Sequence, residues 1–170
     1  MKESVSLISV QPRLLEKVYP WEDQPVLVCR LSLPQVTGPG RGPRRIDRYY
    51  RHLERRLLAW LSARHARACC LAEEALAASR PIPHSQVTVG YQIPFQDENL
   101  LSVLWQLETD GICRRYADLW ALSDGAPLDC RSLLPAKVAR KHRRQMLLLT
   151  AEGVCEWDEA GWTLIWSPPA

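Results

Sequence analysis

The 170-residue sequence has no long hydrophobic run. A membrane-spanning helix needs roughly 18 or more consecutive apolar residues, and polar residues interrupt every apolar stretch of this chain well before that length. The segment after Met1 also lacks the apolar centre of a signal peptide, because Glu3, Gln11 and Arg13 fall within it. The sequence therefore predicts a cytoplasmic protein with no membrane segment.

Lysine is scarce, and the positive charge comes almost entirely from arginine. Only four of the 22 basic residues are lysines, and the net charge is +3. The arginines are mixed with Asp and Glu along much of the chain, whereas nucleic-acid-binding proteins usually carry a basic stripe on one face. Nucleic acid is therefore not the expected partner. The densest basic run, residues 137–144, is expected to be a solvated helix face, and nucleic-acid binding through Arg140 to Arg144 is the alternative.

Motifs that carry catalysis or bind metals are missing. The chain has no CxxC, no pair of histidines at ligand spacing, and no GxSxG, Walker or GxGxxG motif. Its six cysteines are scattered, as is typical of reduced, buried thiols. The glycine-rich run at 38–43 contains two prolines, which remove backbone donors that a phosphate cradle needs, so it predicts a turn. We expect no catalytic residue, no metal site and no cofactor.

The strongest positive signal is a helical stripe between residues 43 and 79. Apolar residues recur there at the spacing of one helix face: Ile46, Tyr49 or Tyr50, Leu53, Leu57, Trp60 or Leu61, Ala68, Leu71 and Ala75. A helix of this length spans ~50 Å, which is more than the width of a compact domain of this size. It must therefore lie along an elongated sheet or bend near residues 62–68.

Strand signals lie on both sides of the helix. Residues 1–42 predict two strands: one within Ser4–Val10, where a slip in the alternation leaves the buried face open, and one at Pro25–Leu33. The core-facing side chains of the second strand are expected to be Leu27, Cys29, Leu31 and Leu33, with Val26, Val28, Arg30 and Ser32 facing away.

Residues 86–170 predict a meander of strands. Turn residues at 96–99 separate the first two strands, and the segment TDGICRRYAD, residues 109–118, is expected to connect the second strand to the third. A short helix is expected at 136–146, with Pro135 at its start. Two short strands joined by residues 158–161 close the chain.

Strands, one long helix and then a meander is the order of an α+β protein. We therefore expect a single domain over residues 1–170, in which one long helix packs on a curved antiparallel sheet and a short second helix follows. A chain of this length buries about 70% of its unfolded surface, so a true core forms without disulfides.

Three segments together resemble a bacterial domain of unknown function. LSLPQVTGPGRGPRRIDRYYRHLERRLLAW, from Leu31, is similar to its strand, proline, glycine and long-helix start. VTVGYQIPFQDENLLSVLWQLETDGICRRYADLWALSDGAPLDCRSLLP, from Val87, is similar to its second half, and MLLLTAEGVCEW, from Met146, to a later strand. That family is found in the extracytoplasmic domain of RsiV-type anti-sigma factors, which sense lysozyme, and beside PdaC-type peptidoglycan deacetylase domains.

The resemblance covers most of the chain and departs from the family at its signature loop. Family members read Thr-Gly-Gly-Ala-His there, whereas this chain reads TDGIC at residues 109–113, so one glycine and the histidine are replaced. Lysozyme sensing and cell-wall chemistry therefore do not carry over with the motif. Relatives with a leader are often extracytoplasmic, in contrast to the location expected for this chain.

The candidate contact residues lie in two places. One group comes from the strand connection: Asp110, Cys113, Arg114, Arg115 and Tyr116. Neighbouring arginines favour the thiolate of Cys113, but no base or oxyanion partner is identifiable, so we expect an inert thiol. Trp157 and Trp162 are the other candidates, as walls of a groove for carbohydrate or peptide, although packing at the core rim is their expected role.

We therefore expect a non-enzymatic domain that binds a partner protein or a small ligand and acts as a sensor. A binding module should show a broad exposed aromatic patch. One alternative is a cell-wall-related hydrolase with unidentified catalytic groups, which should show a deep cleft with convergent polar groups. The other alternative is nucleic-acid binding through residues 137–144, which should show salt-dependent retention.

Overall fold

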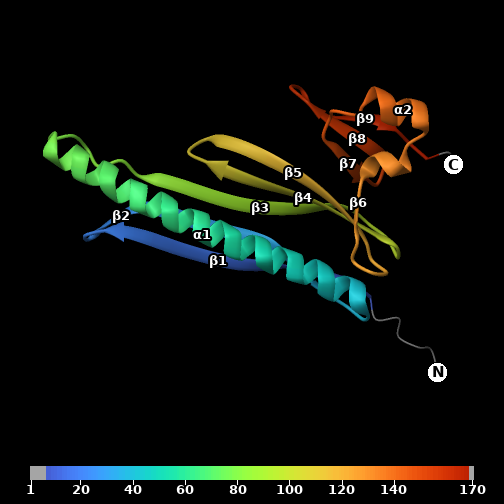
Figure 1. Cartoon of the computed structure of the whole chain (residues 1–170), viewed down its shortest axis with the longest axis horizontal. Helices are drawn as coiled ribbons and strands as arrows, with labels where there is room; N and C mark the ends of the chain where they lie inside the picture. Colours follow the sequence, from blue (N-terminus) through green and yellow to red (C-terminus); the bar gives the residue numbers. More distant parts are fainter. Residues whose placement is uncertain (1–6, 169–170) are drawn as a thin grey trace.

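The protein is an α+β structure built on one long sheet (Figure 1). The computed structural model describes residues 7–168. Six strands form the main sheet in the order of the chain: β1 (Ser9–Trp21), β2 (Gln24–Thr37), β3 (Ser85–Gln96), β4 (Leu100–Thr109), β5 (Ile112–Ala121) and β6 (Pro127–Leu128). The expected class, a long helix packed on a sheet with a short second helix, is confirmed.

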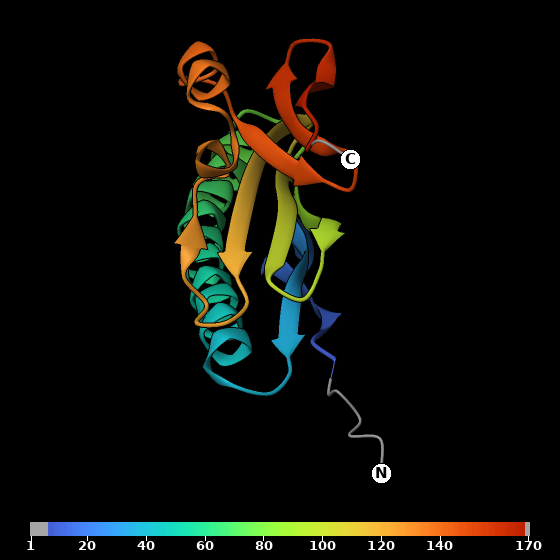
Figure 2. The ribbon, with the colours of Figure 1, turned by 90° about the vertical axis from the view of Figure 1, so that its right-hand side faces the viewer.

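One helix, α1 (Arg41–Ala77), covers one face of the main sheet and runs along it as a single rod (Figures 1 and 2). Its 37 residues correspond to ~55 Å. The helix therefore lies along an elongated sheet and does not bend. Its inner stripe includes Ile46, Tyr50 and Leu61, each 0% exposed. Within residues 7–168, neither helix contains an apolar stretch long enough to cross a bilayer.

Strands β2 and β3 pair in parallel, whereas the other pairs of the main sheet are antiparallel. The parallel ladder joins Leu27–Leu31 to Ser85–Val89. A parallel pair needs a long crossover connection, and α1 is that crossover. The expectation of a wholly antiparallel sheet is corrected at this pair, because alternating hydrophobicity carries no information about strand direction.

A second, smaller sheet packs on the main-sheet face opposite α1, at one end of the molecule (Figure 2). It consists of β7 (Leu147–Thr150), β8 (Gly153–Asp158) and β9 (Gly161–Trp166), and it follows the 3₁₀ helix η1 (Cys130–Leu133) and α2 (Ala136–Lys141). The expected pair of closing strands is present as β8 and β9. The buried side chains between the two sheets are Leu119, Cys130, Leu134, Leu147, Leu149 and Val154.

The first strand and the short helix differ from their expected bounds. Ser4 lies outside the described residues, and β1 continues to Trp21. This length is possible because the prolines of β1 lie on a sheet edge, where no N–H donor is needed. Helix α2 ends at Lys141 and not at residue 146, since the ring of His142 pairs with Glu156 of β8 and the chain turns there towards β7.

The core-facing side of β2 is confirmed, with one exception on its other side. Leu27, Cys29, Leu31 and Leu33 are each at most 1% exposed. Val26 was expected to face away from the core, but it is fully buried. The β1–β2 register shifts beside Val26, which is the extra residue of a bulge, and a bulge turns the side chain of the extra residue out of the alternation.

The start of α1 is fixed against the turn between β5 and β6. A Cβ atom on Gly42 would lie 1.8 Å from the carbonyl oxygen of Leu122. Gly125 has a φ of +70°, and a Cβ there would lie 2.6 Å from the carbonyl oxygen of Gly42. The two backbone segments therefore touch directly, and only glycine permits this approach at both positions.

We predict that Gly42→Ala destabilises the protein by at least about 2 kcal/mol, since the added methyl group forces the backbone of α1 away from Leu122. Gly90→Ala in β3 is the matched control, because nothing lies within 4 Å of a Cβ there; it should be neutral or stabilising by up to about 1 kcal/mol. Urea unfolding of the two variants measures the difference. Equal stabilities would contradict the direct contact.

Candidate functional site

The connection between β4 and β5 is a two-residue turn and not an extended loop. Asp110 has a φ of +50° and Gly111 a φ of +84°, which is the pairing of a type I′ hairpin. Thr109 therefore pairs directly with Ile112, and the segment up to Asp118 belongs to β5. Residues 109–118 were expected to connect the two strands, and this expectation is corrected. Only Asp110 and Gly111 form the turn, and the residues from Ile112 onwards belong to β5.

The outer edge of β5 is mostly free. Strand β6 pairs only with Leu119 and Trp120. The N–H of Ala121 donates outwards to Ala126, and backbone direction alternates along a regular antiparallel strand. The N–H and C=O groups of Cys113, Arg115 and Ala117 therefore also point outwards, and no strand in residues 7–168 pairs with them.

The side chains of β5 divide between the two faces of the sheet. Ile112, Arg114 and Tyr116 are exposed on the face that α1 covers, and Tyr116 stacks on Trp105 of β4 with 4.0 Å between ring centroids. Cys113 and Arg115 lie on the opposite face. The guanidinium of Arg115 lies over the ring of Trp157 in β8, 4.2 Å from its centroid, and the positive charge is attracted to the ring face in a cation–π interaction.

The structure therefore brings some of the candidate residues together and separates others. Trp157 contacts both Arg115 and Trp162, whose ring lies 5.2 Å away in an edge-on arrangement. Cys113 contacts Gln106 across the β4–β5 pair. Asp110 lies at the far end of the hairpin, away from the tryptophans, and interacts with α1 and β3.

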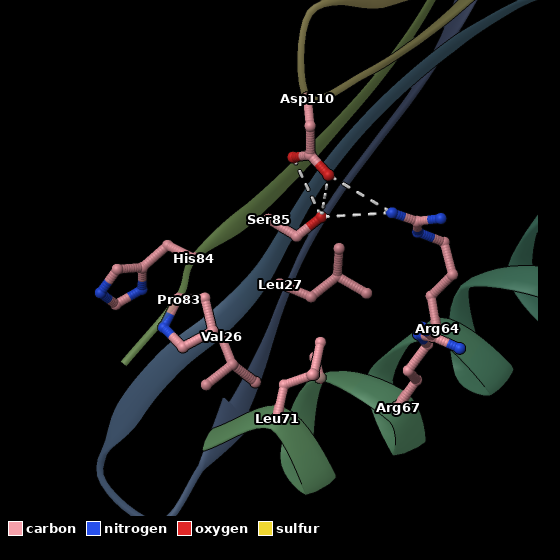
Figure 3. A pocket seen from close by; sticks show the side chains of 10 residues that line it. Val26, Leu27, Arg64, Arg67, Leu71, Pro83, His84, Ser85 and Asp110 are labelled. Atoms are coloured by element: carbon pink, nitrogen blue, oxygen red, sulfur yellow. Dashed lines mark hydrogen bonds and ion pairs between the residues drawn. The ribbon is translucent and has the colours of Figure 1, made fainter. Parts of the chain in front are cut away.

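At the hairpin end, Asp110 joins three elements (Figure 3). Its carboxylate accepts hydrogen bonds from the Ser85 hydroxyl at 2.8 Å and the Gln86 N–H at 2.9 Å, and Arg64 of α1 lies 3.4 Å away. A cavity of about 190 Å³ opens beside this group. The Ser85 hydroxyl faces a carboxylate, while the neighbouring His84 contacts the carbonyl of Pro25, so these residues do not form a serine–histidine relay.

Two further cavities border the edge of β5 on the α1 side. One, of about 320 Å³, lies near the hairpin and is lined by Trp60, Arg64, Asp110, Ile112 and Arg114, among others. The second has a similar volume of about 320 Å³ and lies near β6, with Tyr49, Asp118, Trp120 and Leu128 in its lining. Exposed Tyr116 lies between them on the strand.

Asp118 is a partly buried carboxylate without an ion-pair partner among the described residues. It accepts hydrogen bonds from the Tyr50 hydroxyl at 2.9 Å and the indole N–H of Trp105 at 3.1 Å. The indole N–H of Trp120 donates in turn to the Tyr50 hydroxyl at 3.0 Å. Burial raises the pKa of Asp118 because desolvation penalises its charged form, and burial likewise raises the pKa of Tyr50.

The residues around Asp118 were not anticipated as site residues. Tyr50 was expected only as part of the helical stripe, and no site role was expected for Trp105 or Trp120. A signal was present in the alternation of β5, which places Asp118 on the same face as Tyr116 and Trp120. An ionisable residue on a core-facing strand position indicates a buried polar network, because such a group must be hydrogen-bonded.

The remaining sequence candidates are dispersed. All six cysteines are free, and Cys29, Cys130 and Cys155 are buried. Within residues 7–168, no three His, Cys, Asp or Glu side chains gather as a metal site. The basic segment 137–144 covers α2 and the turn after it, where Lys137, Arg140 and Lys141 are exposed.

No family model matches the chain, and no curated protein matches it. The resemblance to the RsiV-type domain accordingly stays a prediction made from the three sequence segments.

We predict that Tyr50→Phe lowers the free energy of unfolding by about 1–3 kcal/mol. The lost hydroxyl leaves the indole N–H of Trp120 without its acceptor and removes one donor from the Asp118 carboxylate. Tyr49→Phe is the control, since Tyr49 is 40% exposed and should change stability little. Thermal or urea unfolding compares the two variants, and a larger effect at Tyr49 would contradict the network.

A second prediction concerns pH. Because the pKa of folded Asp118 is raised above its ordinary value of 3.8, the folded protein binds this proton more tightly than the unfolded chain. The Asp118 contribution to the free energy of unfolding therefore grows as the pH falls through the folded pKa towards 3.8, and it is unfavourable at neutral pH.

Asp118→Asn removes this titration. Both hydrogen bonds reach the same carboxylate oxygen, so the amide oxygen of Asn can accept them. The variant should be more stable than the parent at neutral pH, and the stability difference should shrink in acid. Urea unfolding of both proteins between about pH 4 and about pH 8 measures this difference, and a gap that widens in acid would contradict the raised pKa.

Proposed function

We propose that the chain is a non-enzymatic binding domain that recognises an extended polypeptide segment as an added strand on β5. The observation that carries this proposal is the row of outward backbone groups at Cys113, Arg115 and Ala117. An added strand takes its affinity from hydrogen bonds to such groups and its specificity from pockets for alternate side chains.

The side-chain surroundings of β5 support this mode of binding. The edge from Ile112 to Asp118 spans ~20 Å, and a cavity of about 320 Å³ lies towards each end of it on the α1 side. Alternate side chains of an added strand would face these cavities. Ile112, which is 68% exposed, and Tyr116, which is 37% exposed, supply apolar contact between them. The partner segment is accordingly expected to carry apolar residues at alternate positions.

The charged residues of β5 do not obstruct its edge. Arg115 lies over Trp157 on the opposite face, and Arg114 lines the cavity near the hairpin. Strand β1, at the other edge of the main sheet, is different. Pro12 pairs with Pro34, and proline has no N–H to offer to an added strand, so β1 carries a feature that discourages edge pairing.

The sensory role belongs to this proposal as well. A domain that captures an extended segment can report the presence of a partner protein, which agrees with the role implied by the resemblance to RsiV-type domains. The signature histidine of that family is replaced by Cys113, on the edge proposed to bind. We therefore expect a partner other than lysozyme.

The proposal predicts that Ala117→Pro abolishes peptide binding and leaves the fold intact. Its N–H points away from β4, so proline removes an outward donor without breaking the ladder. Leu14→Pro is the matched control. Pro12 and Pro34 lie opposite each other and neither has an N–H, so this pair exchanges no hydrogen bonds and the backbone of Pro12 points away from β2. Backbone direction repeats every two residues, so the N–H and C=O groups of Leu14 also point outwards from β1.

The probe is a random peptide library displayed on phage and selected on the full chain. Recovered peptides should share apolar residues at alternate positions and bind the parent and Leu14→Pro, but not Ala117→Pro. Hydrogen exchange supplies a second readout: the amides of Cys113, Arg115 and Ala117 should exchange quickly in the free protein and slowly with peptide. Protection along β1, or undiminished binding by Ala117→Pro, would overturn the proposal.

A further inference from the structure

Positive charge is concentrated in the first half of α1. Residues 41–56 contain seven arginines and two carboxylates, a net charge of +5, whereas the whole chain carries +3. The rest of the chain is therefore net negative. We call the seven residues the arginine row: Arg41, Arg44, Arg45, Arg48, Arg51, Arg55 and Arg56. The description of the arginines as mixed with Asp and Glu along the chain does not hold for this segment.

Most of the arginine row lies on the outer face of α1, and Arg45 lies at its margin, beside Gly125 and the cavity near β6. All seven side chains are exposed, while Ile46, Tyr50 and Leu57 of the same segment are buried. Among the described residues, only Arg51 of the row forms an ion pair, with Asp47. Asp47 is also paired with Arg13 of β1 at 2.8 Å, so it neutralises little of the row.

This arrangement works against the stability of the helix. The row contains six arginine pairs at i,i+3 or i,i+4 spacing, and like charges at these spacings destabilise a helix. The first turn of α1 has no acidic residue, although the positive end of the helix dipole favours carboxylates there and disfavours cations. Charge placed against both effects indicates that the row meets an anion.

The side chains of the row also form an open hollow. Arg41, Arg44, Arg45 and Arg48 surround a volume of about 560 Å³ that no other residue lines. The hollow therefore presents guanidinium groups without a competing carboxylate. Guanidinium binds phosphate through two parallel hydrogen bonds and is the side chain best suited to that anion.

The shape of the surface selects among polyanions. Within residues 7–168 no other element covers the outer face of α1, which stands as a straight ridge on the main sheet (Figures 1 and 2). The row extends over ~22 Å of this ridge, and the major groove of a B-form duplex, about 12 Å wide, admits an α-helix. Arginine binds phosphate oxygens as well as guanine edges, and the proposal assigns the row to the phosphate backbone, whose contacts carry no sequence information.

We propose that the arginine row binds double-stranded nucleic acid through its phosphate backbone. The row adjoins the peptide site only at Arg45, which lines the cavity near β6, and its other arginines lie away from the outer backbone groups of β5, so this activity goes beyond peptide recognition. It also differs from the alternative drawn from the sequence, because the contact lies on α1 and not on residues 137–144.

The test is titration of the full chain with a fluorescently labelled DNA duplex of about 20 base pairs at salt concentrations from about 50 mM to about 200 mM. Binding by the parent should weaken steeply with salt. Arg44→Gln with Arg48→Gln removes two phosphate contacts and should reduce the slope of log affinity against log salt by about 2. The matched control, Arg143→Gln with Arg144→Gln, makes the same charge change in the other basic segment and should leave affinity and slope unchanged.

The remaining outcomes are equally decisive. A row variant that binds as tightly as the parent, or a control variant that loses as much affinity, would overturn the assignment. So would tighter binding to single-stranded DNA of the same sequence, or to vesicles with anionic lipid. Urea unfolding should show that the row variant is at least as stable as the parent, since it relieves like-charge repulsion. Ala117→Pro should retain DNA binding, which separates this test from that of the peptide site.

Discussion

Burial of the inner stripe of α1 against the main sheet is the interaction on which the rest of the structure depends. Within residues 7–168, the strands before the helix pair with those after it only along the short parallel ladder between β2 and β3. The apolar cluster under α1 draws Leu31 from β2, Val89 from β3 and Trp120 from β5 into one core with Tyr50. Each such side chain contributes about 1.5–3 kcal/mol when it leaves water, so the helix joins two strand groups that share few backbone hydrogen bonds.

The two proposed binding surfaces exist because few helices and strands cover α1 and β5. A single helix covers one face of the main sheet, so within residues 7–168 no further element packs on its outer side, where most of the arginine row lies. Strand β6 covers only the end of β5, which leaves the remaining backbone groups of β5 outward. Close backbone contacts at Gly42 and Gly125 hold the first turn of α1 against the β5–β6 turn. The elements that carry the two proposed surfaces therefore touch directly at this point.

The sequence predicted those features of the fold that depend on a regular spacing of apolar residues. The long helix and the buried side of β2 followed from regular spacing, because one face of each meets the same core. The Asp110–Gly111 hairpin was accessible too, since Asp-Gly is a strong hairpin signal, but the charged residues after it favoured reading a connection. The parallel β2–β3 pair, the reach of β1 past Pro12 and the Tyr50–Asp118 contact were not accessible. They depend on which strand lies beside which, and that is decided by tertiary packing.

The crossover also has a kinetic consequence. The partners Leu27 and Ser85 are 58 positions apart in the chain, whereas β1–β2 and β3–β4–β5 are joined by tight turns. Hairpins close in microseconds, but a long loop must lose its conformational entropy before distant contacts compensate. We therefore expect formation of the parallel ladder to limit the folding rate, so that substitutions at its interface with α1 slow folding more than those in either hairpin.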